Sequence, residues 1–239
     1  MNGLDLAVCL MFNYCRITSL ACCIKDGTVI AEARRLKKDF NRKIPLQDLG
    51  ANLKSRELKF AIEDVPSFLE FMSYIYFCGA TISGPWYEFK DFDTFIKLEG
   101  DFKSIPSTLR PAFRRYMDAW LCVAVGTLFD HFFPNAFMLS DEFASHSLVW
   151  KIAYSWGTLK NMMYRTYMVG WCLMEVGSLA SGLSFNGLDD KGDPKWDRVK
   201  SCNIYKLETS WQVKDFLANW NMSAHNWLKY YVYLRQLDN

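Results

Sequence analysis

Long apolar runs alternate with strongly basic blocks along this chain, and that alternation limits the folds open to it. The apolar runs cover residues 3–24, 116–139 and 148–185, whereas the blocks 25–64 and 86–115 are rich in Lys and Arg. A mean hydropathy of −0.07 hides this segregation. A helix of roughly 20 mostly apolar residues crosses the hydrocarbon core of a bilayer. Because strand-like alternation is not sustained, the sequence predicts an all-α, multi-spanning membrane protein with broken or re-entrant helices.

The distribution of charge predicts how the chain is oriented. Segments 25–64 and 186–239 carry an excess of Lys and Arg, while the short segment 140–146 is acidic. Because cytosolic loops are enriched in Lys and Arg, we expect the first two segments to face the cytosol and the third to face the lumen. The whole chain, residues 1–239, is expected to form one membrane-embedded domain. Asp5 argues against a cleaved signal peptide, which begins with basic residues.

A short apolar helix is predicted between the two basic blocks. Pro66 suits the first turn of a helix reading P-S-F-L-E-F-M-S-Y-I-Y-F, and Gly79 with the Gly84-Pro85 pair ends it. If both flanking blocks are cytosolic, this helix dips into the membrane and returns. Such backbone is tolerated only when it packs inside protein or beside a water-filled cavity. A simple crossing with a basic lumenal loop is the alternative.

The cysteines and the net charge exclude several classes of protein. None of the eight cysteines forms a C-x-x-C pair and most lie in apolar runs, so we expect buried thiols that pack as small hydrophobic groups. A zinc site or a disulfide framework is not supported. A net charge of +2 gives no basis for a nucleic-acid partner.

An aromatic segment near the end of the chain reads W-N-M-x-x-x-x-W-L-K from Trp220 to Lys229. Apolar residues recur through it at three- and four-residue intervals, which predicts one amphipathic helix with Asn221 inside it. An Asn at such a position is commonly a helix cap or a solvated side chain. A buried Asn amide, with two donors and one acceptor, can instead orient a hydroxyl or hold an oxyanion. The residues alone leave both interpretations open.

Two further segments precede this motif. The first is P-S-F-L-E-F-M-S-Y-I-Y-F followed by G-P-W-Y-E-F-K, and the second is the turn-rich F-N-G-x-D-x-x-G-x-P-x-W-D from Phe185 to Asp197. In this order, the three segments resemble the membrane-bound O-acyltransferase family, most closely its lysophospholipid acyltransferase branch. The resemblance covers nearly the whole chain. The first spans of the family and its His-bearing C-terminal spans have no counterpart in this sequence.

The resemblance implies transfer of a fatty acyl group from acyl-coenzyme A to the hydroxyl of a lysophospholipid, in the endoplasmic reticulum membrane. It implies Asn221 as a catalytic residue and Trp196, Trp220 and Trp227 as substrate-binding residues. Acyl-coenzyme A is implied as a co-substrate, with no bound cofactor or metal. Four basic residues are expected to attract the anionic coenzyme A or a lipid phosphate: Lys191, Lys195, Arg198 and Lys200.

In the family, an active-site His lies downstream of the Asn on a separate apolar helix. The histidines of this chain are His131, His146 and His225, and the chain stops at Asn239 before such a helix. The match does not transfer to His225, so we expect this polypeptide by itself to lack acyltransferase activity. The alternative is a non-catalytic, truncated membrane protein that binds lipid or associates with a full-length acyltransferase. A reading frame that continues past Asn239 into an apolar helix containing W-H-G would favour the acyltransferase over the non-catalytic protein.

Overall fold

Helices make up the regular structure of this protein. The computed structural model describes residues 3–39, 53–79 and 84–237, and none of the residues in these ranges lies in a strand. The predicted all-α class is therefore confirmed for this part of the chain. The elements of the first part are α1 (Gly3–Asp39), α3 (Ser55–Phe60), α4 (Phe68–Ile75), α5 (Phe89–Ile96), the 3₁₀ turn η1 (Gly100–Ser104) and α6 (Leu109–Phe132).

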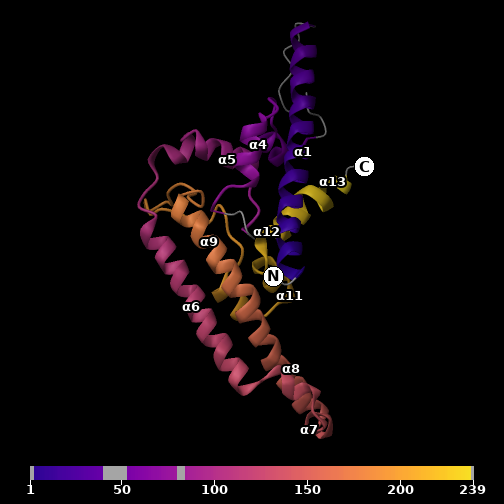
Figure 1. Ribbon diagram of the computed structural model, residues 1–239. Helices are drawn as coiled ribbons and strands as arrows, with labels where there is room; N and C mark the ends of the chain where they lie inside the picture. The colour runs from indigo at the N-terminus through magenta and orange to yellow at the C-terminus, as the bar shows by residue number, and fades with distance from the viewer. Residues whose placement is uncertain (1–2, 40–52, 80–83, 238–239) are drawn as a thin grey trace.

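The second part of the chain returns along α6 and then crosses to α1. Its elements are η2 (Asn135–Leu139), α7 (Asp141–Ser145), α8 (Leu148–Met162), the π-helical turn η3 (Met163–Met168), α9 (Val169–Ser181), α10 (Ile204–Glu208), α11 (Val213–Asn219), α12 (Met222–Trp227), the π-helical turn η4 (Leu228–Tyr233) and α13 (Leu234–Gln236). Figure 1 shows α6 packed antiparallel to α8–η3–α9, with α7 at the far tip of this pair and α12 beside α1.

Helix α1 differs from the sequence-based prediction. The sequence predicts a turn at Asp26-Gly27, yet α1 continues through both residues. Gly27 instead permits a close approach, because a Cβ there would lie 1.8 Å from the backbone oxygen of Ile62. The backbone N–H of Ile62 donates to the Cys23 oxygen at 3.0 Å. Asp26 is buried and binds the Arg235 guanidinium through both carboxylate oxygens. Residues 25–39 of the predicted extramembrane loop are therefore helix.

We expect Gly27→Ala to lower the free energy of unfolding by about 1–3 kcal/mol, because the added methyl group meets backbone that cannot yield without moving the 61–63 segment. Denaturant unfolding in detergent micelles measures the change. Gly170→Ala is the control, since a Cβ there meets only the Met174 methyl group at 3.7 Å. Equal stability of the two variants would contradict the close approach at Gly27.

A compact aromatic core lies beside α1. Ser67 caps α4: its Oγ accepts the backbone N–H of Glu70 at 3.3 Å, and the Glu70 carboxylate accepts the N–H of Ser67 at 2.7 Å. Tyr74 of α4 has no exposed surface, and its ring lies edge-on to Tyr87 and Phe89 with centroids 5.2 Å away. A helix is confirmed in this stretch, but it begins at Phe68, so Pro66 precedes the cap and does not stand in the first turn. At eight residues it is about 12 Å long, too short to cross a core of about 30 Å.

Helix α6 belongs to the one segment of the described residues that is long and apolar enough to cross a membrane, Leu109–Leu139. Only 11% of its most apolar window is buried in the structure. The core helix of a water-soluble protein is mostly buried, so this exposure favours contact with lipid. The apolar runs 3–24 and 148–185 do not pass the same test of length and composition, so several spans are not established.

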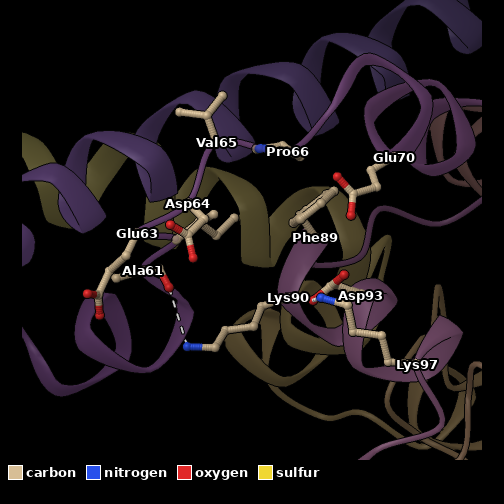
Figure 2. Close-up of a pocket in the computed structure, with 11 residues that line it drawn as sticks. Ala61, Glu63, Asp64, Val65, Pro66, Glu70, Phe89, Lys90, Asp93 and Lys97 are labelled. Atoms are coloured by element: carbon tan, nitrogen blue, oxygen red, sulfur yellow. Dashed lines mark hydrogen bonds and ion pairs between the residues drawn. The ribbon is translucent and has the colours of Figure 1, made fainter.

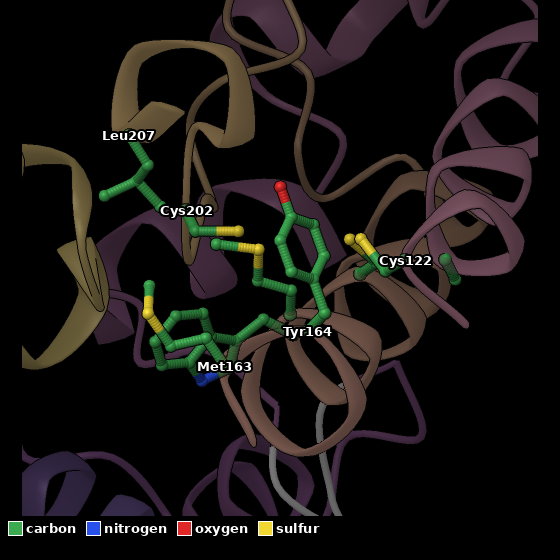
Figure 3. Packing of buried hydrophobic residues seen from close by; sticks show 9 residues of the cluster. Cys122, Met163, Tyr164, Cys202 and Leu207 are labelled. Atoms are coloured by element: carbon green, nitrogen blue, oxygen red, sulfur yellow. The ribbon is translucent and has the colours of Figure 1, made fainter. Parts of the chain in front are cut away.

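A sulfur-rich core joins α6, α9 and the C-terminal segment. Cys122, Cys172 and Cys202 are buried together with Tyr164, and their thiols are free (Figure 3). The prediction that cysteines pack as buried hydrophobic groups is confirmed for these three, whereas Cys78 is exposed.

Charged side chains within the apolar run 148–185 all have polar partners, as charges in an apolar setting require. The contacts are Lys151 with the Ala144 oxygen (2.7 Å), Lys160 with Glu208 (2.6 Å), Arg165 with Asp130 (2.7 Å) and Glu175 with Arg115 (2.8 Å). The last of these pairs joins α9 to α6 and is the most deeply buried.

Candidate active site

The Asn221 motif forms two helices rather than one. Helix α11 ends before this residue and α12 begins after it, and Asn221 itself has a φ of 42°. Its Oδ1 accepts the backbone N–H of Ala224 at 3.3 Å, which makes it the N-cap of α12. Asparagine adopts the left-handed conformation more readily than most residues and is favoured at N-caps. The prediction of one continuous helix is therefore wrong here, because the cap and the left-handed backbone outweigh the apolar periodicity.

Segment 201–203 holds the Asn221 turn in place. The two backbone hydrogen bonds between them run from Met222 N–H to the Ser201 oxygen (2.7 Å) and from Asn203 N–H to the Asn219 oxygen (3.2 Å). Glu175 of α9 holds the same segment, because one carboxylate oxygen accepts the N–H groups of Ser201 at 2.5 Å and Cys202 at 3.2 Å. The position of the turn thus depends on α9 as well as on its own sequence.

The cap also decides how the Asn221 amide is oriented. Oxygen and nitrogen of an Asn amide are assigned from the hydrogen-bond network, and the Ala224 N–H requires Oδ1 on its side. Nδ2 of Asn221 therefore keeps two N–H donors that no described residue accepts. These donors are the groups that a bound substrate can use.

The three tryptophans predicted to bind substrate lie in separate environments. Trp220 packs edge-on against Trp171 of α9, with ring centroids 4.7 Å apart. Trp227 lies edge-on to Tyr14 of α1 at 5.9 Å, and its indole N–H is buried without an acceptor among the described residues. Trp196 lines a pocket between α6 and α9. The structure therefore does not bring the three together into one binding surface.

That pocket has a volume of about 760 Å³ and lies between the start of α6, the end of α9 and segment 196–208. Arg110, Arg114 and Lys200 line it and have no acidic partner among the described residues. The carboxylates in its lining are all paired: Asp118 and Glu175 with Arg115, and Glu208 with Lys160. Its apolar wall consists of Pro111, Leu121, Leu179, Trp196 and Ile204. A basic side beside an apolar wall suits a ligand with anionic groups and an apolar chain.

Of the four basic residues expected to attract such a ligand, Lys200 alone lines the pocket. Arg198 is occupied, because it binds Asp91 at 2.7 Å and Asp101 at 2.8 Å. Lys191 and Lys195 are exposed and lie outside the lining. Basic residues at the surface of a turn-rich loop thus do not all serve one site.

Sequence reasoning missed Arg110 and Arg114. Their block was interpreted only as a signal of topology. The available signal was their spacing, because residues four apart lie on the same face of a helix, and both stand in the first turns of α6. The pocket they line could not be inferred, since α9 and segment 196–208 come from later parts of the chain.

A second pocket of about 450 Å³ has the opposite charge (Figure 2). Four carboxylates and two amines line it: Glu63, Asp64, Glu70 and Asp93, with Lys90 and Lys97. Lys97 is already paired with Asp93 at 2.7 Å. The excess of carboxylates makes this pocket unsuited to a polyanion.

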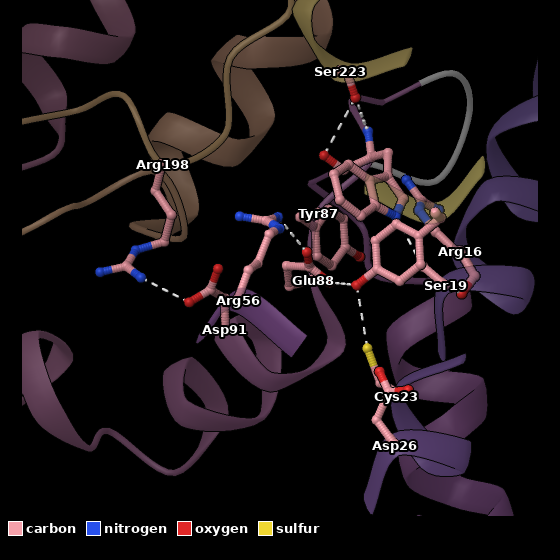
Figure 4. A network of polar contacts seen from close by, with 12 residues as sticks. Arg16, Ser19, Cys23, Asp26, Arg56, Tyr87, Glu88, Asp91, Arg198 and Ser223 are labelled. Atoms are coloured by element: carbon pink, nitrogen blue, oxygen red, sulfur yellow. Dashed lines mark hydrogen bonds and ion pairs between the residues drawn. The ribbon is translucent and has the colours of Figure 1, made fainter. Parts of the chain in front are cut away.

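A buried carboxylate links η4, the π-helical turn after α12, to the rest of the fold. Glu88 accepts a hydrogen bond from Arg56 at 2.5 Å and another from the Tyr231 hydroxyl at 2.6 Å (Figure 4). Burial raises the pKa of Glu88 to about 7, although the bonds with Tyr231 and Arg56 act in the opposite direction. The Tyr231 oxygen also lies 3.2 Å from Cys23 Sγ on α1.

The histidines do not form a site with Asn221. His225 is exposed, and its backbone N–H donates to the backbone oxygen of Asn221 at 2.9 Å. His131 is exposed near the end of α6, and His146 stacks on Trp150 with centroids 3.9 Å apart. Among the described residues, no group of three or more His, Cys, Asp or Glu side chains is placed to hold a metal ion.

The described residues thus combine an outward-facing apolar helix, an amide held in a turn and a pocket with a basic and an apolar side. The model of the membrane-bound O-acyltransferase family matches residues 4–237, and the chain belongs to that family.

Curated relatives agree with this assignment. The chain is 30% identical over 205 residues to a lysophospholipid acyltransferase of Schizosaccharomyces pombe, covering 82% of the chain and 39% of that relative. It is 29% identical over 243 residues to a lysophospholipid acyltransferase of Saccharomyces cerevisiae, covering 92% and 36%. It is 29% identical over 189 residues to human lysophospholipid acyltransferase 5, covering 77% and 38%. The chain thus spans less than two fifths of the length of these relatives.

Proposed function

We propose that this chain forms part of an O-acyltransferase that moves a fatty acyl group from acyl-coenzyme A to the hydroxyl of a lysophospholipid. The family match and the names of its relatives support this reaction. The observation that carries the proposal is the Asn221 turn, which offers two amide N–H donors from a backbone fixed by its neighbours. We further propose that the protein is multi-pass and resides in the endoplasmic reticulum membrane.

The proposed role of Asn221 follows from the charge changes of the reaction. The lysophospholipid oxygen attacks the thioester carbonyl, the carbon–sulfur bond breaks, and coenzyme A leaves as the thiol after it gains a proton. Negative charge develops on the carbonyl oxygen, where a preorganised amide donor is most effective. Proton removal from the hydroxyl is assigned by the resemblance to a downstream His, and no His follows His225 in this chain.

We propose that the 760 Å³ pocket receives acyl-coenzyme A. Arg110, Arg114 and Lys200 would attract its phosphates, because unpaired cations lining a concave site raise the local concentration of anions. The apolar wall of the pocket would contact the less polar part of acyl-coenzyme A. Cys202 lines the pocket and also belongs to segment 201–203, which holds the Asn221 turn, so the pocket and the amide share a structural element.

We expect Arg114→Glu to raise the KM for acyl-coenzyme A about tenfold, with a smaller change in kcat, because charge reversal repels the phosphates. The effect should shrink as salt is added, since salt screens exposed charges. Initial rates at varied acyl-coenzyme A and ionic strength measure it in membranes that contain the full-length protein. Lys195→Glu makes the same charge change outside the pocket and should leave KM unchanged. Equal KM values for both variants would place the coenzyme A site elsewhere.

The sequence predicts that segments 25–64 and 186–239 face the cytosol and that 140–146 faces the lumen. The proposal keeps segment 25–64 and loop 186–200 on the cytosolic side and α7 on the lumenal side. Trp220 packs on Trp171 rather than on that loop, so we propose that the Asn221 turn lies deeper than loop 186–200. In Figure 1, α7 lies at the opposite end of α6 from its first residues, which supports opposite sides for the two ends.

Single cysteines introduced at Lys38 and Phe143 test the topology in sealed vesicles, with the exposed Cys78 replaced by Ser. We expect an impermeant thiol reagent added from the cytosolic side to label position 38 and to leave position 143 unlabelled until the vesicles are opened. The basic and acidic character of the two segments is the reason. Labelling of position 143 but not of position 38 from the cytosolic side would overturn the proposed topology.

A further inference from the structure

Ser223 stands two residues after Asn221 and is only 3% exposed. Its hydroxyl bonds twice to one residue of a distant segment (Figure 4): it accepts the backbone N–H of Trp86 at 2.5 Å and donates to the backbone oxygen of Trp86 at 3.3 Å. A serine in a helix commonly bonds a carbonyl of its own preceding turn. Here the hydroxyl bonds across the fold, and it ties the first turn of α12 to Trp86.

Trp86 is itself fixed to α1. Its indole Nε1 donates to Ser19 Oγ at 3.0 Å, and its ring lies edge-on to Tyr231 with centroids 5.6 Å apart. Arg16, which has no exposed surface, donates to the Gly84 oxygen at 3.5 Å, two residues before Trp86. The bonds of Ser223 therefore end on a residue that α1 holds through Ser19 and, two residues earlier in the chain, through Arg16.

The Asn221 turn needs such support. One residue with left-handed backbone between two short helices acts as a pivot, because small changes in its φ and ψ swing the attached side chain and the following helix. The Met222 N–H is bonded to Ser201, and Ser223 is bonded to Trp86. Two consecutive residues after the pivot are thus held by two segments that are far apart in the sequence.

We propose that Ser223 is a positioning residue that fixes the direction of the Asn221 amide by fastening α12 to Trp86. This inference rests on the proposed function of Asn221. Ser223 itself contacts no reacting atom; it acts by keeping Nδ2 of Asn221 at the place where the carbonyl oxygen becomes negative. A misplacement of about 1 Å at a reacting centre is enough to cost on the order of 10²-fold in rate.

The test compares Ser223→Ala, Ser223→Thr and Asn221→Asp in the full-length protein, in membranes, with labelled acyl-coenzyme A and lysophospholipid. Ser223→Ala is expected to lower kcat on the order of 10²-fold per folded molecule while the KM values stay unchanged. It should also speed amide exchange at Met222, whose N–H bond reports the position of the turn directly. Ser223→Thr keeps the hydroxyl and should restore most of the turnover. Ser145→Ala, whose hydroxyl bonds only within α7, is the control.

Each outcome of this comparison either supports or overturns the positioning role of Ser223. Wild-type kcat and a protected Met222 amide in Ser223→Ala, while Asn221→Asp is about 10²–10³-fold slower, would overturn the role of Ser223 and leave the proposed function standing. A Thr variant as slow as the Ala variant would assign the loss to packing and would also overturn it. Full turnover by Asn221→Asp would remove the proposed function, and this inference with it. A loss of kcat rescued by Thr, with unchanged KM, supports the inference.

Discussion

An Asn221→Asp variant is expected to transfer acyl groups about 10²–10³-fold more slowly than the wild-type protein, the usual cost of removing one oxyanion donor. Aspartate tolerates left-handed backbone and caps helices as asparagine does, so the turn should persist. It loses both N–H donors of Nδ2 and brings a negative charge to the place where the reaction creates one. Turnover of labelled acyl-coenzyme A by the full-length protein in membranes measures the effect.

Alanine is a poorer choice at this position. It would sit at a φ of 42°, which costs a residue with a Cβ roughly 1–2 kcal/mol, and loss of the cap adds about 0.5–2 kcal/mol. Structural and catalytic losses would then be of similar size. Asn221→Gly removes the amide without the backbone strain, so Gly and Asp variants that are equally slow would assign the loss to the amide.

Asn226→Asp is the matched control for Asn221→Asp. It makes the same change of charge on the same helix, α12, one turn beyond the cap. We expect it to keep near wild-type turnover and membrane insertion. If Asn221→Asp also keeps wild-type turnover, Asn221 is only a cap, and the proposed chemistry loses its main support.

The sequence was sufficient where local patterns decide the structure. Pro66 predicted the start of α4 to within two residues, and the capping pair of Ser67 with Glu70, which fixes that start, lies within one turn of chain. The absence of sustained strand alternation predicted an all-helical fold. Most of the described cysteines within apolar runs are buried as expected, namely Cys15, Cys23, Cys122 and Cys172, whereas Cys22 is partly exposed. These features depend on residues that are near one another in the sequence.

The errors arose where distant residues decide. Gly27 looks like a breaker, but its lack of a side chain serves the contact with Ile62, and α1 runs on. Asn221 interrupts an apolar period that continues on both sides of it, so periodicity alone joins α11 to α12. A cap signal was present in the Asn itself, but the bonds to Ser201 and Trp86 that hold the turn could be seen only in the fold.

The candidate site shows the same division. Asn221 was predicted from the motif in which it stands and Lys200 from a cluster of basic residues. Arg110 and Arg114 become relevant only because α9 and segment 196–208 line a pocket beside them. Arg198 was expected to bind an anion but is held by Asp91 and Asp101. Sequence identifies which residues carry charge; the fold decides which charges are already paired.

The ion pair between Arg115 and Glu175 carries the second large prediction. Arg115 Nε lies 2.8 Å from a Glu175 carboxylate oxygen, with the two side chains only 11% and 5% exposed. The other carboxylate oxygen holds the N–H groups of segment 201–203. We expect Glu175→Ala to lower the free energy of unfolding by about 3–5 kcal/mol. It removes the buried counter-charge of Arg115 and leaves this guanidinium, among the described residues, only the longer, more exposed ion pair with Asp118 at 3.3 Å. Denaturant unfolding in micelles, followed by tryptophan fluorescence, measures it.

A double variant separates the charge from the backbone contacts. Replacing both Arg115 and Glu175 with apolar residues of similar volume removes the uncompensated charge, which in many proteins recovers stability. Here we expect recovery to be incomplete, because two backbone N–H groups of segment 201–203 stay unpaired and buried donors left unpaired cost about 1–3 kcal/mol. Asp93→Ala, which breaks the more exposed pair with Lys97, is the control and should cost at most about 1 kcal/mol. A Glu175→Ala variant as stable as this control would mean that the pair contributes little and that segment 201–203 is held by other contacts.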